Sequence, residues 1–403
     1  MTNELNARPS ARGRMRVYLL AALFLLALPL AASAQEAAPT PFTVVRGTVR
    51  DCAGQPVPGV TVVIVGGNGS VIRVTNSIGE YRAVLAEGTY TVTPTPSGRY
   101  FFSPPNAETE GFGADDFTRY PRDNRANFDG DCKSDVSDFN RGSGEWRSLN
   151  STNGQLVSFY FGTSADVLTP GDYDGDGRTD RAVFRPGNAT WYVATDTSGA
   201  FYGVQFGVTS DLPVAGDYDG DARTDHAVFR PSNGFWYIRR SDGTFYGVPF
   251  GQTADIPAPG DYDGDGRTDI AVFRPGTGDW HFLYSSGGTA QVHWGQAGDS
   301  PVQADYDGDG RADIAVFRPG PADWYILNSS DGQTQSVHWG QSGDRPAPAD
   351  YDGDGRADIA IQRLDSTSAF WILPSATGSY YAVSNFGEFP VPLGYLSPRS
   401  QWY

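Results

Sequence analysis

A repeat of about 45 residues constrains the fold of this 403-residue chain more than any other feature. The string Asp-Tyr-Asp-Gly-Asp-Gly-Arg-Thr-Asp begins at Asp172 and returns with small changes at Asp217, Asp261, Asp305 and Asp350, and a degenerate copy begins at Asn127. The six copies start 45, 45, 44, 44 and 45 residues apart, so insertions between them are nearly absent. A fixed period of this length is typical of architectures in which each unit buries its apolar face against its neighbours.

Each repeat contains four short β-type runs. The first run follows the acidic string, as in residues 270–274, and the third ends in an aromatic-Gly pair such as Phe206-Gly207. A short fourth run, such as residues 212–215, leads into the next acidic string. The second run is centred on a tryptophan, which is Trp146, Trp191, Trp236, Trp280, Trp324 or Trp371. Four strands per repeat predict the blades of a β-propeller, with the tryptophans and aromatic-Gly pairs serving blade-to-blade packing.

The number of repeats predicts six blades and leaves seven open. The segment at residues 390–395 is similar to the approach to a further loop, but no aspartates follow it. The run that leads into the first repeat is polar by contrast. We therefore expect the C-terminal segment to supply a strand to the first blade and to close the ring.

The rest of the chain lacks this period. Residues 1–34 combine four arginines, an apolar stretch and Ala32-Ser33-Ala34, which predicts a cleaved secretory signal peptide. Residues 35–42 form a short linker, residues 43–120 alternate Val and Thr between Gly and Pro as in a small antiparallel β-sandwich, residues 121–126 form a second linker, and residues 127–403 form the propeller. No later apolar run approaches the about 20 residues of a membrane-spanning helix. We expect an exported protein, secreted, periplasmic or at the cell surface, without a transmembrane segment after cleavage.

The acidic strings predict a calcium site in each repeat. Carboxylates at alternate positions of a glycine-containing loop converge on one point, and a cation with six to eight oxygen ligands suits that arrangement. Side chains at positions one, three, five and nine and the backbone carbonyl of the arginine at position seven are the candidate ligands. These residues are Asn127, Asp129, Asp131, Asp135, Asp172, Asp174, Asp176, Arg178, Asp180, Asp217, Asp219, Asp221, Arg223, Asp225, Asp261, Asp263, Asp265, Arg267, Asp269, Asp305, Asp307, Asp309, Arg311, Asp313, Asp350, Asp352, Asp354, Arg356 and Asp358.

The net charge agrees with this prediction. The chain carries −17, which becomes about −20 when the arginine-rich signal is removed. The six loops hold 23 of the 47 acidic residues, and six calcium ions would bring the net charge to about −8. Such acidity argues against nucleic acid as a partner, because nucleic-acid binders carry basic patches, and it disfavours adsorption to an anionic membrane.

The loops are not equivalent. The first has Asn127 in place of aspartate and Cys132 in place of the glycine at position six, and the third has Ala222 at that position. A non-glycine residue in a left-handed conformation costs roughly 1–2 kcal/mol. We therefore expect these two loops to bind calcium more weakly than the other four.

Residues from about 127 to 396 resemble the VCBS/FG-GAP repeats of the integrin-α type, on the strength of the D-x-D-G-D-G-x-x-D string, the fixed period and the aromatic-Gly strand end. The resemblance implies a propeller that carries calcium loops. Residues 43 to about 119 resemble a carboxypeptidase regulatory-like domain, which is a non-catalytic module. Together they imply a calcium-binding scaffold for adhesion or ligand binding, with an extracellular protein, matrix or glycan as partner.

Two other functions stay open. Some propellers that this chain resembles hold sugars between blades, and Tyr202, Tyr246 and Trp339 would stack on a pyranose ring. A polysaccharide-active enzyme is the other, but the four histidines, His226, His281, His293 and His338, lie inside the repeats, and no nucleophile elbow, P-loop or zinc motif occurs. We therefore expect no catalytic residues. Whether Cys52 and Cys132 form a disulfide also stays open, since spacing alone does not show proximity.

Overall fold

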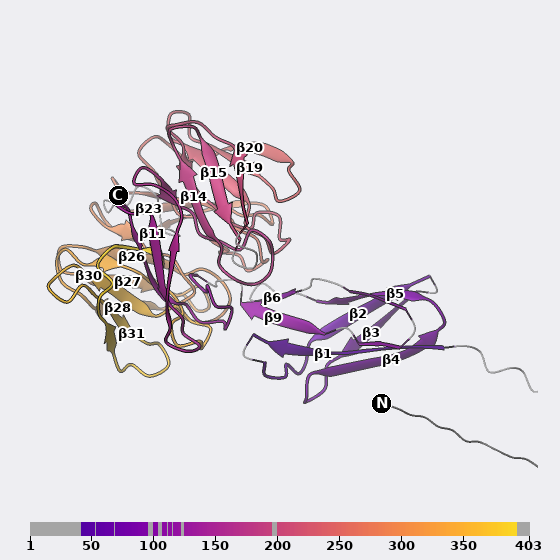
Figure 1. Ribbon diagram of the computed structural model, residues 1–403. Helices are drawn as coiled ribbons and strands as arrows, with labels where there is room; N and C mark the ends of the chain where they lie inside the picture. Colours follow the sequence, from indigo (N-terminus) through magenta and orange to yellow (C-terminus); the bar gives the residue numbers. More distant parts are fainter. Residues whose placement is uncertain are drawn as a thin grey trace, which may run out of the picture. The chain divides into compact units, whose positions relative to one another are not determined.

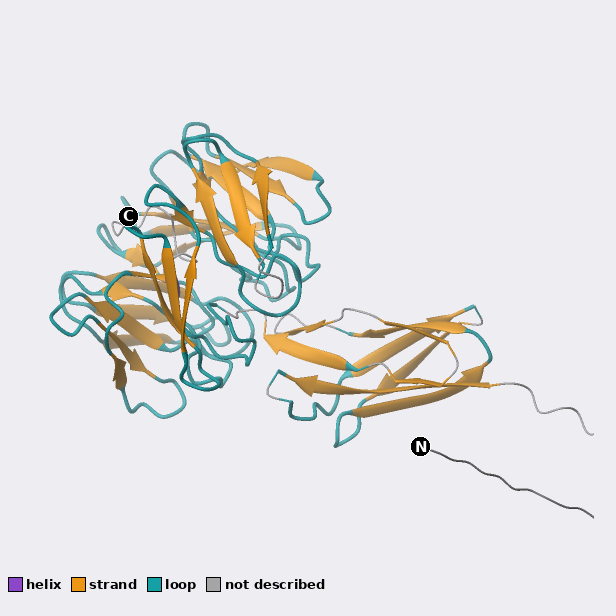
Figure 2. Cartoon of the chain, in the orientation of Figure 1, coloured by secondary structure: helices purple, strands orange, loops and turns teal. Residues whose placement is uncertain are grey.

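The computed structural model describes residues 42–392 apart from 53, 68, 96–99, 104–106, 111, 115, 122–124 and 196–199. The expected signal peptide, the linker up to residue 41, part of the second linker and residues 393–403 lie outside the described residues. The expectation of an all-β protein is confirmed, because the described residues form strands and loops without an α-helix (Figure 2). They accordingly include no helix with the length and hydropathy that a membrane crossing requires.

The N-terminal part is a sandwich of two sheets. One sheet has the strand order β4-β1-β9-β6, with β8 also paired to β1, and the other has the order β3-β2-β5-β7. The strands are β1 (Phe42–Asp51), β2 (Thr61–Gly66), β3 (Gly69–Val74), β4 (Glu80–Ala86), β5 (Thr89–Pro94), β6 (Tyr100–Ser103), β7 (Ala107–Glu110), β8 (Phe112–Ala114) and β9 (Phe117–Pro121). Most pairs are antiparallel, as expected, but β1 runs parallel to β8 and β9.

The sandwich core follows from the alternation of side chains along its strands. Side chains of a strand point to opposite faces in turn, so every second residue reaches the space between the sheets. Val62 and Ile64 of β2 are fully buried in this way, as are Val45 and Val49 of β1. Phe117 of β9 packs on the same cluster. The inner face of the sandwich is therefore apolar, whereas the outer face mixes threonines with exposed aliphatic residues such as Val65, Ile72 and Val84.

The C-terminal part contains six four-stranded antiparallel sheets, several of which are labelled in Figure 1. They are the blades of a propeller. Their strands are β10 (Val136–Asn140), β11 (Glu145–Leu149) and β12 (Leu156–Tyr160); β13 (Val167–Leu168), β14 (Arg181–Arg185), β15 (Thr190–Ala194) and β16 (Phe201–Gln205); β17 (Leu212–Pro213), β18 (His226–Arg230), β19 (Phe235–Arg239) and β20 (Phe245–Pro249); β21 (Ile256–Pro257), β22 (Ile270–Arg274), β23 (Asp279–Leu283) and β24 (Thr289–His293); β25 (Ser300–Pro301), β26 (Ile314–Arg318), β27 (Asp323–Leu327) and β28 (Thr334–His338); β29 (Arg345–Pro346), β30 (Ile359–Arg363), β31 (Ala369–Leu373) and β32 (Tyr381–Val383); and β33 (Phe389–Pro390).

The ring closes through the last described strand. β33 pairs antiparallel with β10, placing Phe389 opposite Phe139 and Pro390 opposite Asp138. The first blade thus takes three strands from the start of the propeller and its fourth from the end of the chain. Among the described residues, this settles the number of blades at six and confirms the expected strand exchange.

The blade cores explain the aromatic residues of the repeat. Ala182, Val183 and Phe184 of β14 are all fully buried, as expected for a strand covered on both faces. Opposite Phe184 lies Trp191, whose indole Nε1 donates to the carbonyl oxygen of Phe206, the aromatic residue of the aromatic-Gly pair. The same Trp-to-carbonyl bond occurs in the first, third, fourth and fifth blades. It satisfies the buried indole N–H, which would otherwise be costly to bury.

The aromatic-Gly pairs also reach the next blade. The Trp294 indole donates to the Tyr325 carbonyl of β27, and the Trp339 indole donates to the Trp371 carbonyl of β31. The expected blade-to-blade packing role is confirmed for these residues.

The sixth blade departs from the expected register. Phe370, not Trp371, lies in the buried position of the other tryptophans, because Phe370 faces Gln362 as Trp324 faces Phe317, while Trp371 takes the place of Tyr325. Gln362 lies opposite Phe370, where the other blades have phenylalanine, and its amide donates to the carbonyls of Phe386 and Glu388. The assignment of Trp371 to the core tryptophan position is therefore wrong by one residue.

Candidate metal centres

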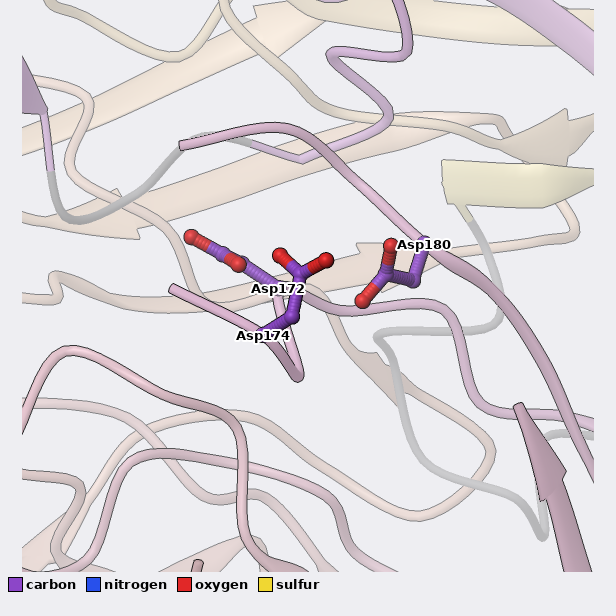
Figure 3. A group of neighbouring side chains, drawn as sticks. All are labelled: Asp172, Asp174 and Asp180. Carbon is purple, nitrogen blue, oxygen red and sulfur yellow. The ribbon is translucent and has the colours of Figure 1, made fainter. Parts of the chain in front are cut away.

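Each acidic loop is folded by its own carboxylates. In the second repeat, Asp172 accepts backbone hydrogen bonds from Gly175 at 2.7 Å and Gly177 at 2.9 Å. Asp180 accepts one from the N–H of Tyr173, so the end of the loop is tied back to its beginning. The carboxylates of Asp172, Asp174 and Asp180 consequently lie close together (Figure 3).

Five repeats hold such a group of three carboxylates. One oxygen from each carboxylate lies within 4.8 Å of the other two. The groups are Asp172, Asp174 and Asp180; Asp217, Asp219 and Asp225; Asp261, Asp263 and Asp265; Asp305, Asp307 and Asp313; and Asp350, Asp352 and Asp358. In four of them the members are positions one, three and nine of the loop, whereas the fourth repeat brings position five in place of position nine.

The first repeat brings no such group together among the described residues. Asn127 replaces the first carboxylate and uses its amide oxygen to accept the N–H groups of Gly130 and Asp131. Asp129, Asp131 and Asp135 still bond the loop internally and to the next turn. The first loop therefore keeps the backbone fold of the others but offers fewer charged ligands.

The aspartates at position five mostly point to a neighbouring turn. This turn joins the tryptophan-bearing strand of the blade to the strand that ends in the aromatic-Gly pair, and its serine hydroxyl donates to the position-five carboxylate. The pairs are Ser151 with Asp131, Ser241 with Asp221, Ser285 with Asp265, Ser329 with Asp309 and Ser375 with Asp354. The backbone N–H of each serine also donates to the position-nine aspartate, as from Ser285 to Asp269 at 2.7 Å. Sequence reasoning missed these serines, although each follows its position-nine aspartate by 16 or 17 residues.

A second set of aspartates supports the loops from outside. Asp166, Asp211, Asp255, Asp299 and Asp344 each precede a loop by six residues and form a two-point salt bridge with an arginine of the same blade. Asp255, for example, binds the Arg274 guanidinium through both oxygens, at 2.9 and 3.0 Å. The same carboxylate accepts the backbone N–H of Gln252. These aspartates are fully buried and are fixed by their arginines, so they fold the segment before the loop and are not available to a metal.

Burial makes the loop carboxylates resist ionisation. The pKa of Asp225 is raised to about 8, first by burial and then by the neighbouring carboxylates Asp219 and Asp217. The pKa of Asp172 is raised to about 7, first by burial and then by Asp176 and Asp174. Burial raises the pKa of Asp261 and Asp350 to about 7 as well. Such carboxylates hold protons near neutral pH unless a bound cation replaces those protons.

The position-six residues confirm the expected backbone strain. Cys132 and Ala222 have φ angles of 74° and 68°, in the left-handed region. The glycines in the same place have similar angles, such as 86° for Gly177 and 84° for Gly266. The loops of the first and third repeats thus keep the common conformation at a cost that glycine does not incur.

The two cysteines form a disulfide, Cys52 with Cys132, across 80 residues of sequence. It joins the end of β1 in the sandwich to the first acidic loop of the propeller. The question that the sequence left open is therefore answered in favour of the bond.

The fold and the loops together define a class: a six-bladed β-propeller with an acidic loop in every repeat, preceded by a β-sandwich. The family model of the FG-GAP-like repeat matches residues 217–272, 261–316 and 305–361, and that of the carboxypeptidase regulatory-like domain matches residues 44–106. The chain thus contains three FG-GAP-like repeats within its propeller and an N-terminal carboxypeptidase regulatory-like domain.

Solved structures with similar folds are distant from this chain. The virginiamycin B lyase from Staphylococcus aureus is 10% identical, with a TM-score of 0.42 over 62% of this chain and 81% of its own. A chain of the nidogen/laminin complex is 11% identical, with a TM-score of 0.44 over 64% of this chain and 95% of its own. Among curated proteins, none matches this chain in sequence.

Proposed function

We propose that this protein is an exported, calcium-stabilised propeller scaffold that binds an extracellular protein, matrix or glycan partner and has no catalytic activity of its own. The observation that carries the proposal is the group of three converging carboxylates in five of the six repeats. A propeller whose blades each contain an ion site is a rigid support for a binding surface, because its loops are held by the ions.

The donor set favours calcium. All candidate ligands are oxygen atoms, and a site with several carboxylates and no nitrogen or sulfur ligand suits a hard divalent cation. Magnesium prefers a rigid octahedron and keeps its waters, whereas calcium accepts six to eight ligands in irregular geometry. Up to six ions are proposed, about one per repeat, with the first loop binding most weakly because Asn127 and Cys132 replace a ligand and a glycine.

Thermal unfolding tests the calcium proposal. An ion that binds only the native state stabilises it by about 2.7 kcal/mol per site when its concentration is 100 times Kd. Several sites should therefore raise the melting temperature markedly in millimolar calcium relative to excess EGTA. Magnesium at the same concentration is the control and should give a smaller shift. Melting curves that coincide in calcium and EGTA would refute the proposal.

The disulfide supports export. Disulfides persist in oxidising compartments and are rare in the cytosol. The pairing of Cys52 with Cys132 therefore fits the secretory signal expected from residues 1–34. The compartment beyond export, whether periplasm, cell surface or medium, is part of the same proposal and would be assigned by fractionating cells that express the full chain.

The placement of the histidines supports a non-catalytic role. His293 and His338 lie on the outer strands β24 and β28, where their Nδ1 atoms are 2.9 and 2.8 Å from the carboxylates of Asp279 and Asp323. Both pairs are the same contact in consecutive blades. His226 is buried among the rings of Tyr173, Trp191 and Tyr202. The repeated contacts of His293 and His338 and the burial of His226 favour a packing role for these histidines over a catalytic one.

A further inference from the structure

The six acidic loops are linked to one another by backbone hydrogen bonds. The carbonyl of the first residue of each loop accepts the N–H of the eighth residue of the following loop, at 2.6–2.8 Å. These bonds run from Thr179 to Asn127, Thr224 to Asp172, Thr268 to Asp217, Ala312 to Asp261, Ala357 to Asp305 and Ser134 to Asp350. The last bond returns from the first repeat to the sixth, so the ring of bonds is closed.

A side-chain contact runs in the same direction. The glycine at position four of each loop is covered by the basic side chain at position seven of the following loop. A Cβ atom added at these glycines would lie only 2.9–3.1 Å from that side chain. The pairs are Gly130 with Arg178, Gly175 with Arg223, Gly220 with Arg267, Gly264 with Arg311, Gly308 with Arg356 and Gly353 with Lys133. The one lysine of the chain thus completes the ring where the first repeat meets the sixth.

The loops also surround one space. A cavity of about 240 Å³ is lined by position-one aspartates and position-seven arginines of the second to sixth repeats. The position-one aspartates and position-seven arginines that make the contacts between loops therefore line a common space.

We propose that each candidate ion site is completed by the next blade, so that the six sites form one coupled ring and do not bind independently. The ligands come from one repeat, whereas the basic side chain and the backbone N–H that hold the loop in place come from the following repeat. The position-seven residue is thus a positioning residue for the preceding site.

The coupling has a direction because both contacts do. Asp305 illustrates it: its carboxylate accepts the N–H groups of Gly308 and Gly310, while its carbonyl is held by Ala357. Disturbing the sixth loop should therefore loosen the fifth, whereas the first loop, which itself holds the sixth, should be affected less. The inference rests on the proposed function for the identity of the ion, but the contacts themselves need no ion.

Hydrogen exchange on Arg356→Ala tests the proposal. The substitution keeps the backbone carbonyl of residue 356 and every carboxylate, and removes only the cover over Gly308. We expect the amides of Gly308, Asp309 and Gly310 to exchange about tenfold faster than in the wild type, and those of Gly353 and Gly355 to change less than about twofold. Arg356→Lys should restore slow exchange, because Lys133 already fills this role over Gly353.

The controls separate this inference from the calcium proposal. Arg82→Ala removes an equal charge from the surface of the sandwich and should leave both loops unchanged. The experiment is run in calcium and in EGTA. If hydrogen exchange in the wild type is the same in calcium and in EGTA while Arg356→Ala still speeds exchange in the fifth loop, the calcium proposal fails and the coupling stands. Equal loss in both loops, or loss confined to the sixth loop, would overturn the coupling even if calcium stabilises the wild type.

Discussion

At the scale of single residues, the carboxylates of the acidic loop were predictable from the sequence, whereas the serines that bond to them were not. The carboxylates of a loop lie within nine residues, so local geometry brings three of them together in five of the repeats. Ser285 and Ser329 lie in the turns between β23 and β24 and between β27 and β28, and they reach their aspartates only because the strands of a blade pair, which a local motif does not reveal. The signal in the sequence that could have identified these serines is their nearly fixed spacing from the position-nine aspartate.

Ala222→Gly should stabilise the third repeat. Ala222 has a φ of 68°, where alanine is strained and glycine is not. The gain is expected to be at most about 1 kcal/mol, because glycine also adds disorder to the unfolded chain. Thermal unfolding at saturating calcium measures it, and a calcium titration should show tighter binding.

The reciprocal variant Gly266→Ala is the matched control. It places an alanine at position six of the fourth loop, where the φ of Gly266 is 84°, and should lower the stability of the protein by a similar amount. If both substitutions shift stability in the same direction, backbone strain at position six does not distinguish these loops.

At the scale of the blade, the sixth repeat shows two linked exchanges. The other blades place Phe opposite Trp and use the indole N–H to bind the aromatic-Gly carbonyl. Here Gln362 lies opposite Phe370, and the glutamine amide binds the Phe386 carbonyl at 2.8 Å. The hydrogen-bond donor thus comes from Gln362 on β30 and not from an indole on β31, and the Phe386 carbonyl still has a partner. The repeat comparison missed this because the sixth blade has Phe370-Trp371 where the fifth has Trp324-Tyr325, so its tryptophan stands one strand position later.

Gln362→Phe should therefore be costly alone and less costly when combined with Phe370→Trp. The single change removes the donor to the buried Phe386 carbonyl and the part-buried Glu388 carbonyl, and an unsatisfied buried group costs about 1–3 kcal/mol. The double variant restores the arrangement of the other five blades, including the indole donor. Chemical unfolding of the four members of the cycle should give an interaction energy of about 1 kcal/mol or more. Additive effects would show that the two positions are independent.

At the scale of the whole molecule, the six blades and their closure were predictable from the repeat count and from the leftover segment after Phe386-Gly387. The parallel pairing of β1 with β8 and β9 was not, because alternation fixes which face of a strand is buried but not the direction of its partner.

Phe389→Ala should weaken the ring at its closure. Phe389 is 5% exposed and packs with Phe139 and Trp146 in a cluster that extends to neighbouring blades. Removing a buried phenylalanine side chain costs about 3–5 kcal/mol. Chemical unfolding should report this loss, while Tyr160→Ala on the exposed edge of the same blade should cost under about 1 kcal/mol. Equal losses would mean that β33 does not hold the ring closed.

The strand exchange at β33 also sets the order in which the chain can reach its native state. Asn140 and Glu388, which bond across the closure, are 248 residues apart, so the pairing belongs to the most non-local contacts of the molecule. Until the C-terminal residues have been synthesised, β10 presents an unpaired edge that can recruit a foreign strand. Closure late in synthesis, and slow folding with it, therefore follow from where one two-residue strand lies in the sequence.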